Sequence, residues 1–142
     1  MKLEKSCGAI IYKYVEDELY ILLLKHNRGH YSFAKGHVEG NETEEETAIR
    51  EIKEETNLDV NLDTKFRSVH RYSPKENVLK DVVLFLAVPK INTEKEKNQE
   101  EEIEKLIWLK EQEALNKLTY EEDREILEKA IKYIKGDEYE ER

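Results

Sequence analysis

The chain has 142 residues, of which 40% are charged, and its formal net charge is −9 at pH 7. Duplex nucleic acid is therefore not expected as a partner, because phosphate binding depends on an excess of lysine and arginine. Apolar runs such as CGAIIY, LYILLL and VVLFLAV supply the core of a single domain over residues 1–142, so the high charge does not indicate disorder.

The predicted elements alternate between strands and helices along the chain. The expected strands cover residues 6–14, 19–26, 31–33, 58–69, 78–88 and 106–109, with the first two forming a hairpin. The expected helices cover residues 43–56, 110–117 and 120–134. A polar loop is expected at 91–101 and a charged tail after the last helix. This order predicts an α/β protein in which helices cover a mixed β-sheet.

The segment 43–56 has the features of a capped amphipathic helix. It contains no glycine or proline, and Thr43 followed by Glu46 has the spacing of a capping box. Asn57 is expected to take the left-handed conformation in which many helices end. The expected buried face consists of Ala48, Ile49 and Ile52.

Cysteine content and hydropathy bear on the compartment. Cys7 is the only cysteine and lies in an apolar run, so it is predicted to be a core residue in a reducing environment. No segment approaches the roughly 20 apolar residues that span a bilayer, and the N-terminus lacks the pattern of a signal peptide. The sequence predicts a cytoplasmic protein with no membrane partner and leaves its oligomeric state open.

Three glutamates on the 43–56 helix raise the question of function. At about 100° per residue, Glu51, Glu54 and Glu55 share one arc beside the apolar face. They are either part of a solvated face, which helix geometry alone favours, or ligands of a divalent cation. Like charges at these spacings destabilise a bare helix, and carboxylate oxygens suit Mg²⁺ or Mn²⁺. Gly36 and Arg50 favour the second interpretation, because a solvated helix requires neither of them.

These residues resemble the Nudix box, G-x5-E-x7-R-E-U-x-E-E-x-G-U, where U is a bulky aliphatic residue. Eight of its nine specified positions match, and Asn57 replaces the last glycine with a residue that tolerates the same backbone conformation. The matching residues are Gly36, Glu42, Arg50, Glu51, Ile52, Glu54, Glu55 and Leu58. The order of the predicted elements agrees with the family over nearly the whole chain. The resemblance implies a Nudix hydrolase with an α/β/α sandwich around a mixed sheet.

The resemblance also implies roles for the box residues. Nudix enzymes hydrolyse a nucleoside diphosphate linked to another group, with divalent ions that neutralise the pyrophosphate and lower the pKa of a bound water. The implied metal ligands are Glu51, Glu54, Glu55, Glu102 and the carbonyl oxygen of Gly36. One of these glutamates would accept the proton of the water, and Glu54, Glu51 and Arg50 form the implied catalytic set. Arg50 would orient Glu51 through a charge-assisted hydrogen bond, and Glu42 would anchor the loop.

Stretches around the box resemble one group within the family, the asymmetric bis(5′-nucleosyl)-tetraphosphatases, or diadenosine tetraphosphate hydrolases. The matching stretches are GHYSF at 29–33, KGHVE at 35–39 and KDVVLFLA at 80–87. Glu102 lies six residues before Trp108, as the additional acidic ligand of that group does. Ala34 and Leu84 depart from the proline and tyrosine of the group, and these departures bear on substrate choice more than on the chemistry.

The expected substrate contacts follow from these stretches. Lys35, His37 and Lys80 are predicted to bind phosphate groups. Tyr72 and Tyr120 are expected either to stack on nucleobases or to be half-buried structural residues. The remaining histidines, His26, His30 and His70, are expected to be surface or structural residues.

The function expected from the sequence is Mg²⁺- or Mn²⁺-dependent cleavage of diadenosine tetraphosphate to ATP and AMP. Two alternative activities are removal of pyrophosphate from RNA 5′ ends and hydrolysis of single nucleoside triphosphates. A further alternative is a module that binds a nucleotide without cleaving it. The complete acidic set of the box favours an enzyme.

Overall fold

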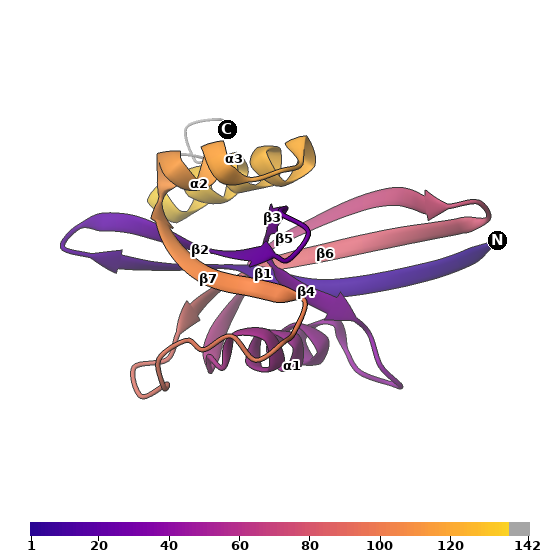
Figure 1. Cartoon of the computed structure of the whole chain (residues 1–142), viewed down its shortest axis with the longest axis horizontal. Helices are drawn as coiled ribbons and strands as arrows, with labels where there is room; N and C mark the ends of the chain where they lie inside the picture. The colour runs from indigo at the N-terminus through magenta and orange to yellow at the C-terminus, as the bar shows by residue number, and fades with distance from the viewer. Residues whose placement is uncertain (137–142) are drawn as a thin grey trace.

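The computed structural model describes residues 1–136 and contains strands and helices in the predicted order (Figure 1). The strands are β1 Lys2–Val15, β2 Glu18–His26, β3 Tyr31–Ser32, β4 Ala34–His37, β5 Val60–Lys75, β6 Val78–Pro89 and β7 Ile103–Lys110. The helices are α1 Glu44–Thr56, α2 Glu111–Lys117 and α3 Glu121–Lys135. The predicted charged tail lies mostly outside the described residues.

The strands form one mixed sheet with the order β3-β2-β1-β6-β5, and two further strands join it: β4 pairs with β1, and β7 pairs with β2. β1 and β6 run parallel, whereas the other pairs are antiparallel. β1 is long enough to serve both halves of the sheet, pairing with β4 through residues 6–9 and with β2 through residues 12–15. The prediction of a mixed sheet is therefore confirmed.

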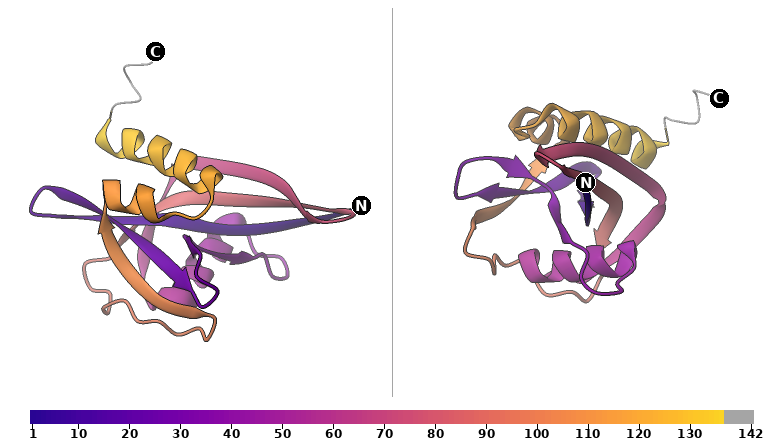
Figure 2. Two further views of the ribbon diagram at one scale, coloured as in Figure 1. Left: turned by 45° about the horizontal axis from the view of Figure 1, so that its top comes forward. Right: turned by 90° about the vertical axis from the view of Figure 1, so that its right-hand side faces the viewer.

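Helices cover both faces of this sheet (Figures 1 and 2). Alternate residues of β6 show the two cores: Val83 and Phe85 pack in the cluster that contains Ile52 of α1. Their neighbours Leu84 and Leu86 pack in the cluster of α2 and α3. A strand buried on both faces needs apolar residues at every position, which explains the uninterrupted run VVLFLAV. The α/β/α sandwich is confirmed.

Helix α1 begins and ends as its sequence predicts. Thr43 and Glu46 form the capping box, and Asn57 ends the helix in the left-handed region with φ 67°. The predicted buried face is wrong at Ile49, which is 46% exposed. Two threonines take inner positions instead, because their hydroxyl groups find hydrogen-bond partners: Thr47 donates to Glu42, and Thr56 donates to the carbonyl of Ile52.

Other boundaries differ from the prediction where pairing between distant segments decides them. β4 lies beyond the predicted strand at 31–33 and forms against residues 6–9 of β1. β5 continues to Lys75 rather than ending at residue 69, because its register with β6 resumes at Lys75–Val78 after an irregularity. Cys7 is fully buried as predicted, and this burial raises the pKa of its thiol to about 11. Among residues 1–136, none of the helices has the length and hydropathy that crossing a bilayer requires.

Candidate active site

Strand β4 brings Gly36 directly against α1. A Cβ atom at Gly36 would lie 2.0 Å from the carboxyl carbon of Glu51, so only glycine leaves room for this carboxylate. The helix phase explains the closeness. At about 100° per residue, Glu51 and Glu55 point between Thr47 and Ala48, that is, into the packed face of the helix rather than away from it. The fully solvated interpretation of the acidic face is therefore wrong for Glu51 and Glu55.

Arg50 organises the carboxylates around it. Its guanidinium donates two hydrogen bonds to Glu42, from Nε at 2.6 Å and from Nη2 at 2.9 Å. It also donates to Glu51 at 2.9 Å and to Glu54 at 3.2 Å. The bonds from Arg50 hold the pKa of Glu42 low, at about 2, so Glu42 remains ionised. The contact expected between Arg50 and Glu51 is present, as is the loop-anchoring contact of Glu42, which also accepts from the backbone N–H of Glu39.

Glu55 is the most desolvated carboxyl group of the cluster. Burial, together with the nearby charge of Glu51, raises its pKa to about 8. It accepts a hydrogen bond from the backbone N–H of Lys35 at 3.2 Å. Two carboxylates in one partly buried place repel each other, and a cation that binds both would remove this cost.

The loop between β6 and β7 adds further acidic residues. The amide of Gln99 donates to the carbonyl oxygens of Lys53 and Glu54, which fixes the loop over the C-terminal end of α1. Burial and the charges of Glu102, Glu54 and Glu51 raise the pKa of Glu100. Glu102 itself is exposed. The sequence predicts Glu102 from its spacing to Trp108 and does not single out Glu100, on which the charges of Glu54 and Glu51 act in the folded loop.

The donor set of this cluster fits a divalent cation. Its members are hard carboxylate oxygens, some with raised pKa, beside a glycine position that leaves space for Glu51. In the part of the chain that the structure describes, no three acidic, histidine or cysteine side chains already stand in the arrangement of a metal site. Glu51 and Glu54 are turned toward Arg50, so their side chains would reorient when an ion binds.

A pocket of about 490 Å³ opens between the sheet and the start of α3. Its lining residues are His26, His30, Ser32, Lys35, His70, Tyr72, Lys80, Val82, Tyr120, Glu122, Asp123 and Ile126. Four of the five predicted substrate residues are thus brought together. The fifth, His37, is exposed and does not line the pocket, and its nearest acidic partner is Glu4 at 3.9 Å.

Aromatic rings form two groups in this pocket. The ring of His26 stacks on that of His30, with centroids 4.0 Å apart, and His30 lies 6.1 Å from Tyr120. His70 stacks on Tyr72 with centroids 5.6 Å apart. The sequence predicts His26, His30 and His70 as surface or structural residues and does not place them in a pocket, whereas all three line this one. For His30, the GHYSF resemblance was an available signal, whereas His70 is placed only by β5.

The pocket is also the most basic part of the site. Lys35 and Lys80 both line it, and burial together with the charge of Lys35 lowers the pKa of Lys80. Burial, with His30 and Lys35 nearby, lowers the pKa of His26 to about 4, so His26 is neutral at pH 7 and accepts or donates through its contact with Ser32 at 2.8 Å. Phosphate groups between the two lysines would meet cationic charge, with aromatic rings on either side.

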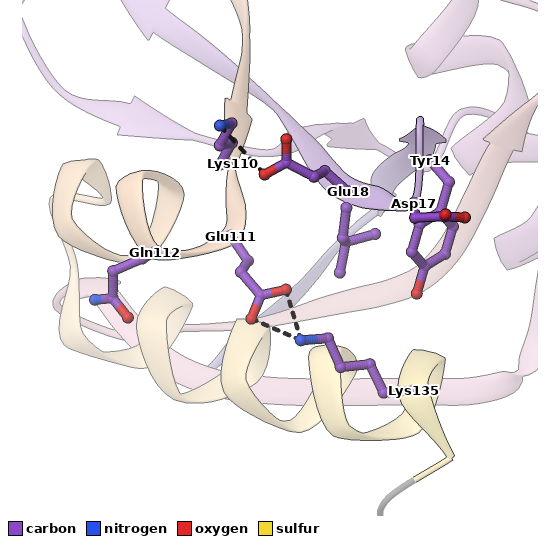
Figure 3. A pocket seen from close by; sticks show the side chains of 8 residues that line it. Tyr14, Asp17, Glu18, Lys110, Glu111, Gln112 and Lys135 are labelled. Carbon is purple, nitrogen blue, oxygen red and sulfur yellow. Dashed lines mark hydrogen bonds and ion pairs between the residues drawn. The ribbon is translucent and has the colours of Figure 1, made fainter.

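A second pocket, of about 340 Å³, lies at the turn of the β1–β2 hairpin (Figure 3). Four of its charged groups are already paired: Lys110 bonds to Glu18, and Lys135 bonds to Glu111. It contains none of the predicted site residues.

Residues 5–130 match the NUDIX domain, so the chain belongs to the Nudix family. The class of protein defined by this fold and site is a hydrolase that acts on phosphoric anhydride bonds.

Particular relatives are similar over nearly their whole length. The asymmetrical bis(5′-nucleosyl)-tetraphosphatase of Caenorhabditis elegans is 28% identical over 136 residues, which cover 93% of this chain and 97% of that protein. A crystal structure of a C. elegans Ap4A hydrolase binary complex matches with a TM-score of 0.84 and 26% identity, covering 94% of this chain and 98% of the other. The NUDIX domain of Shewanella oneidensis NrtR, cocrystallised with ADP ribose, shares the fold with a TM-score of 0.74 at 14% identity, over 94% of this chain and 89% of that one.

Proposed function

We propose that this chain hydrolyses dinucleoside tetraphosphates asymmetrically, releasing ATP and AMP from diadenosine tetraphosphate, with Mg²⁺ or Mn²⁺ as its cofactor. The observation that carries this proposal is the position of Lys35. Its backbone N–H bonds to Glu55 of the carboxylate cluster, while Lys35 also lines the aromatic and basic pocket. A polyphosphate chain that enters from the pocket would therefore reach the carboxylates. The similarity to the C. elegans tetraphosphatase over nearly the whole chain supports the same assignment.

The residues of α1 would hold the ion and move the proton. Glu51, Glu54 and Glu55, with the carbonyl oxygen of Gly36, would bind the divalent ion. Once bound, the ion would neutralise the phosphate charge and lower the pKa of the attacking water. A carboxylate of the cluster would accept the proton of that water. Arg50 restricts the side chains of Glu51 and Glu54 by its hydrogen bonds, and Glu42 fixes Arg50 in turn.

The pocket residues would bind the rest of the substrate. Lys35 and Lys80 are point charges for phosphate oxygens. Tyr72 and Tyr120, which are 40% and 50% exposed, present ring faces for stacking with a base. The substrate is therefore proposed to be a small nucleotide in the cytoplasm rather than a duplex nucleic acid.

Product analysis on a panel of substrates tests this function. The panel contains diadenosine tetraphosphate, ATP and triphosphorylated RNA, each with Mg²⁺, with Mn²⁺ and with a chelator. ATP and AMP are the expected products of diadenosine tetraphosphate, and the chelator should abolish the reaction. Formation of two ADP molecules would exclude asymmetric cleavage. Faster hydrolysis of ATP or RNA would identify one of the alternative enzymes, and binding without turnover of any substrate would indicate a nucleotide-binding module.

A further inference from the structure

One acidic side chain of the pocket has no role in binding phosphate. Asp123 lines the pocket together with Lys35 and Lys80, although a carboxylate there repels a polyphosphate. It is partly buried, and this burial raises its pKa, with Lys35 the largest influence in the opposite direction. A carboxylate that lines the pocket can accept hydrogen bonds from a ligand group that carries N–H or O–H donors.

Asp123 does not have the structural role that a carboxylate commonly has at the third residue of a helix, which is to accept a hydrogen bond from the N-cap N–H. Asp123 is the third residue of α3, and the third residues of α1 and α2 are Glu46 and Glu113. Glu46 accepts from the N-cap N–H of its helix at 2.9 Å, and Glu113 does so at 3.4 Å. The carboxylate of Asp123 makes no such bond, nor any other hydrogen bond or ion pair with residues 1–136. Its acceptor oxygens are therefore available to a ligand in the pocket.

The neighbouring rings indicate which part of a ligand would lie there. His70 and Asp123 are close enough for their charges to interact, and His70 stacks on Tyr72. The charge of Asp123 also acts on His30, whose ring centroid lies 6.1 Å from that of Tyr120. A base stacked on either group of rings would present its hydrogen-bonding edge within this part of the pocket.

We propose that Asp123 is a specificity-determining residue that accepts hydrogen bonds from the N–H groups of a purine base and thereby favours guanine over adenine. An ionised carboxylate has acceptors only. The Watson–Crick edge of guanine presents two adjacent donors, the ring N1–H and the 2-amino group, whereas that edge of adenine presents an amino donor beside an acceptor. Guanine therefore satisfies both oxygens of Asp123, and adenine satisfies one. The inference refines the proposed function, on which it rests for the class of substrate.

The test compares kcat/KM for diguanosine and diadenosine tetraphosphate in the wild type and in Asp123→Asn. An amide offers one acceptor and one donor, which fits adenine, so the guanine-to-adenine ratio should fall by about 10- to 100-fold, the range for one well-made bidentate contact to a base. Asp123→Ala should bring the ratio close to unity. Glu125→Gln is the matched control, because it removes the same charge from an exposed position of the same helix outside the pocket. It should leave the ratio unchanged.

Two results would overturn the inference. One is an equal change for both bases in Asp123→Asn, which would mean that the carboxylate acts only through its charge. The other is a change confined to ribose against 2′-deoxyribose substrates, which would place the contact at the sugar. Calorimetric titration of GMP and AMP gives the same ratio without turnover. If the wild type binds GMP more tightly than AMP and Asp123→Asn reverses this preference, the inference is supported even when neither tetraphosphate is cleaved. The absence of cleavage would then refute only the proposed function.

Discussion

Helix α1, which carries the carboxylate cluster, and helix α3, whose start lines the pocket, cover opposite faces of the sheet (Figure 2). The cluster and the pocket are stabilised in different ways. In the cluster, Arg50 donates hydrogen bonds to Glu42, Glu51 and Glu54, and the glycine at position 36 leaves a space that Glu51 fills. In the pocket, His26 and Ser32 form the one hydrogen bond between lining side chains of the described residues. The remaining contacts there are ring stacking and charge.

We expect the carboxylate cluster to determine the reaction and the pocket to determine the choice of substrate. The cluster lies mainly on α1 and β4, with Glu42 and the β6–β7 loop beside them, and hydrogen bonds from Arg50 and Gln99 fix its geometry. The pocket takes residues from β2, β3, β4, β5, β6, α3 and two loops, and in the described residues none of its side chains is hydrogen-bonded to the carboxylates of the cluster. Substitutions of pocket residues are therefore the way to test which substrate the protein prefers.

The largest effect is expected from the cluster. Glu54→Gln and Glu55→Gln should each lower kcat by about 100-fold or more, because each removes a carboxylate that is proposed to bind the ion. The fold should persist, as measured by circular dichroism. Glu45→Gln, an exposed change on the same helix, is the control and should retain full activity. Near wild-type turnover in either cluster variant would show that α1 does not bind the metal.

A second change tests the space at Gly36 rather than the charge. In Gly36→Ala, the new Cβ would collide with the carboxylate of Glu51, which can move aside because it is the end of a flexible side chain. We expect an unchanged fold and a fall in kcat of about 10- to 100-fold, the size seen when the support of a metal ligand is lost. Full activity at unchanged metal affinity would mean that Glu51 does not need its present position.

The pocket should respond differently. Tyr120→Ala should raise KM by about 10-fold with a smaller effect on kcat, because base stacking acts away from the reacting phosphorus and stabilises ground and transition states alike. Tyr14→Ala is the matched control, since Tyr14 has a similar exposure, 52% against 50%, and lines the other pocket. If both variants raise KM equally, or if kcat alone falls, Tyr120 is not a binding residue for the base.

The sequence predicts the cluster better than the pocket for a physical reason. The box residues, the capping box of α1 and the left-handed Asn57 all depend on interactions a few residues apart, so their spacing contains the information. The position of Ile49 could not be predicted from apolar periodicity, because Thr47 and Thr56 satisfy their hydroxyl groups locally and occupy the buried face. β4 and the pocket histidines depend on pairing between segments far apart in the chain.

A pH dependence follows from the crowding of carboxylates in the metal-free protein. The pKa of Glu55 is raised by burial to about 8 from an ordinary value of 4.5, so the folded chain binds this proton more tightly than the unfolded chain does. The associated stability is fully present below pH 4.5 and is lost as the pH rises through about 8. With a chelator present, the Tm of the wild type should therefore fall relative to that of Glu55→Gln between these pH values. Parallel Tm curves for the two proteins would contradict the raised pKa.

The smallest expected effect concerns the end of α1, where the register of the cluster depends on one backbone conformation. Asn57 has φ 67° and ψ 5°, which glycine adopts freely and a β-branched residue does not. Asn57→Gly should therefore leave the stability nearly unchanged. Asn57→Val should cost about 1–2 kcal/mol, the difference between left-handed and ordinary backbone for a residue with a Cβ atom. Urea unfolding measures both.

Asn61→Val is the control for the change in side chain. Asn61 is exposed in β5, where a valine fits the extended backbone, so this substitution should be neutral or stabilising. A cost at Asn57 without a cost at Asn61 would assign the effect to backbone conformation. Equal stability of Asn57→Gly and Asn57→Val would show that residue 57 is not left-handed in solution. The end of α1 would then not fix the positions of Glu54 and Glu55, and the carboxylate cluster would be no more rigid than the pocket.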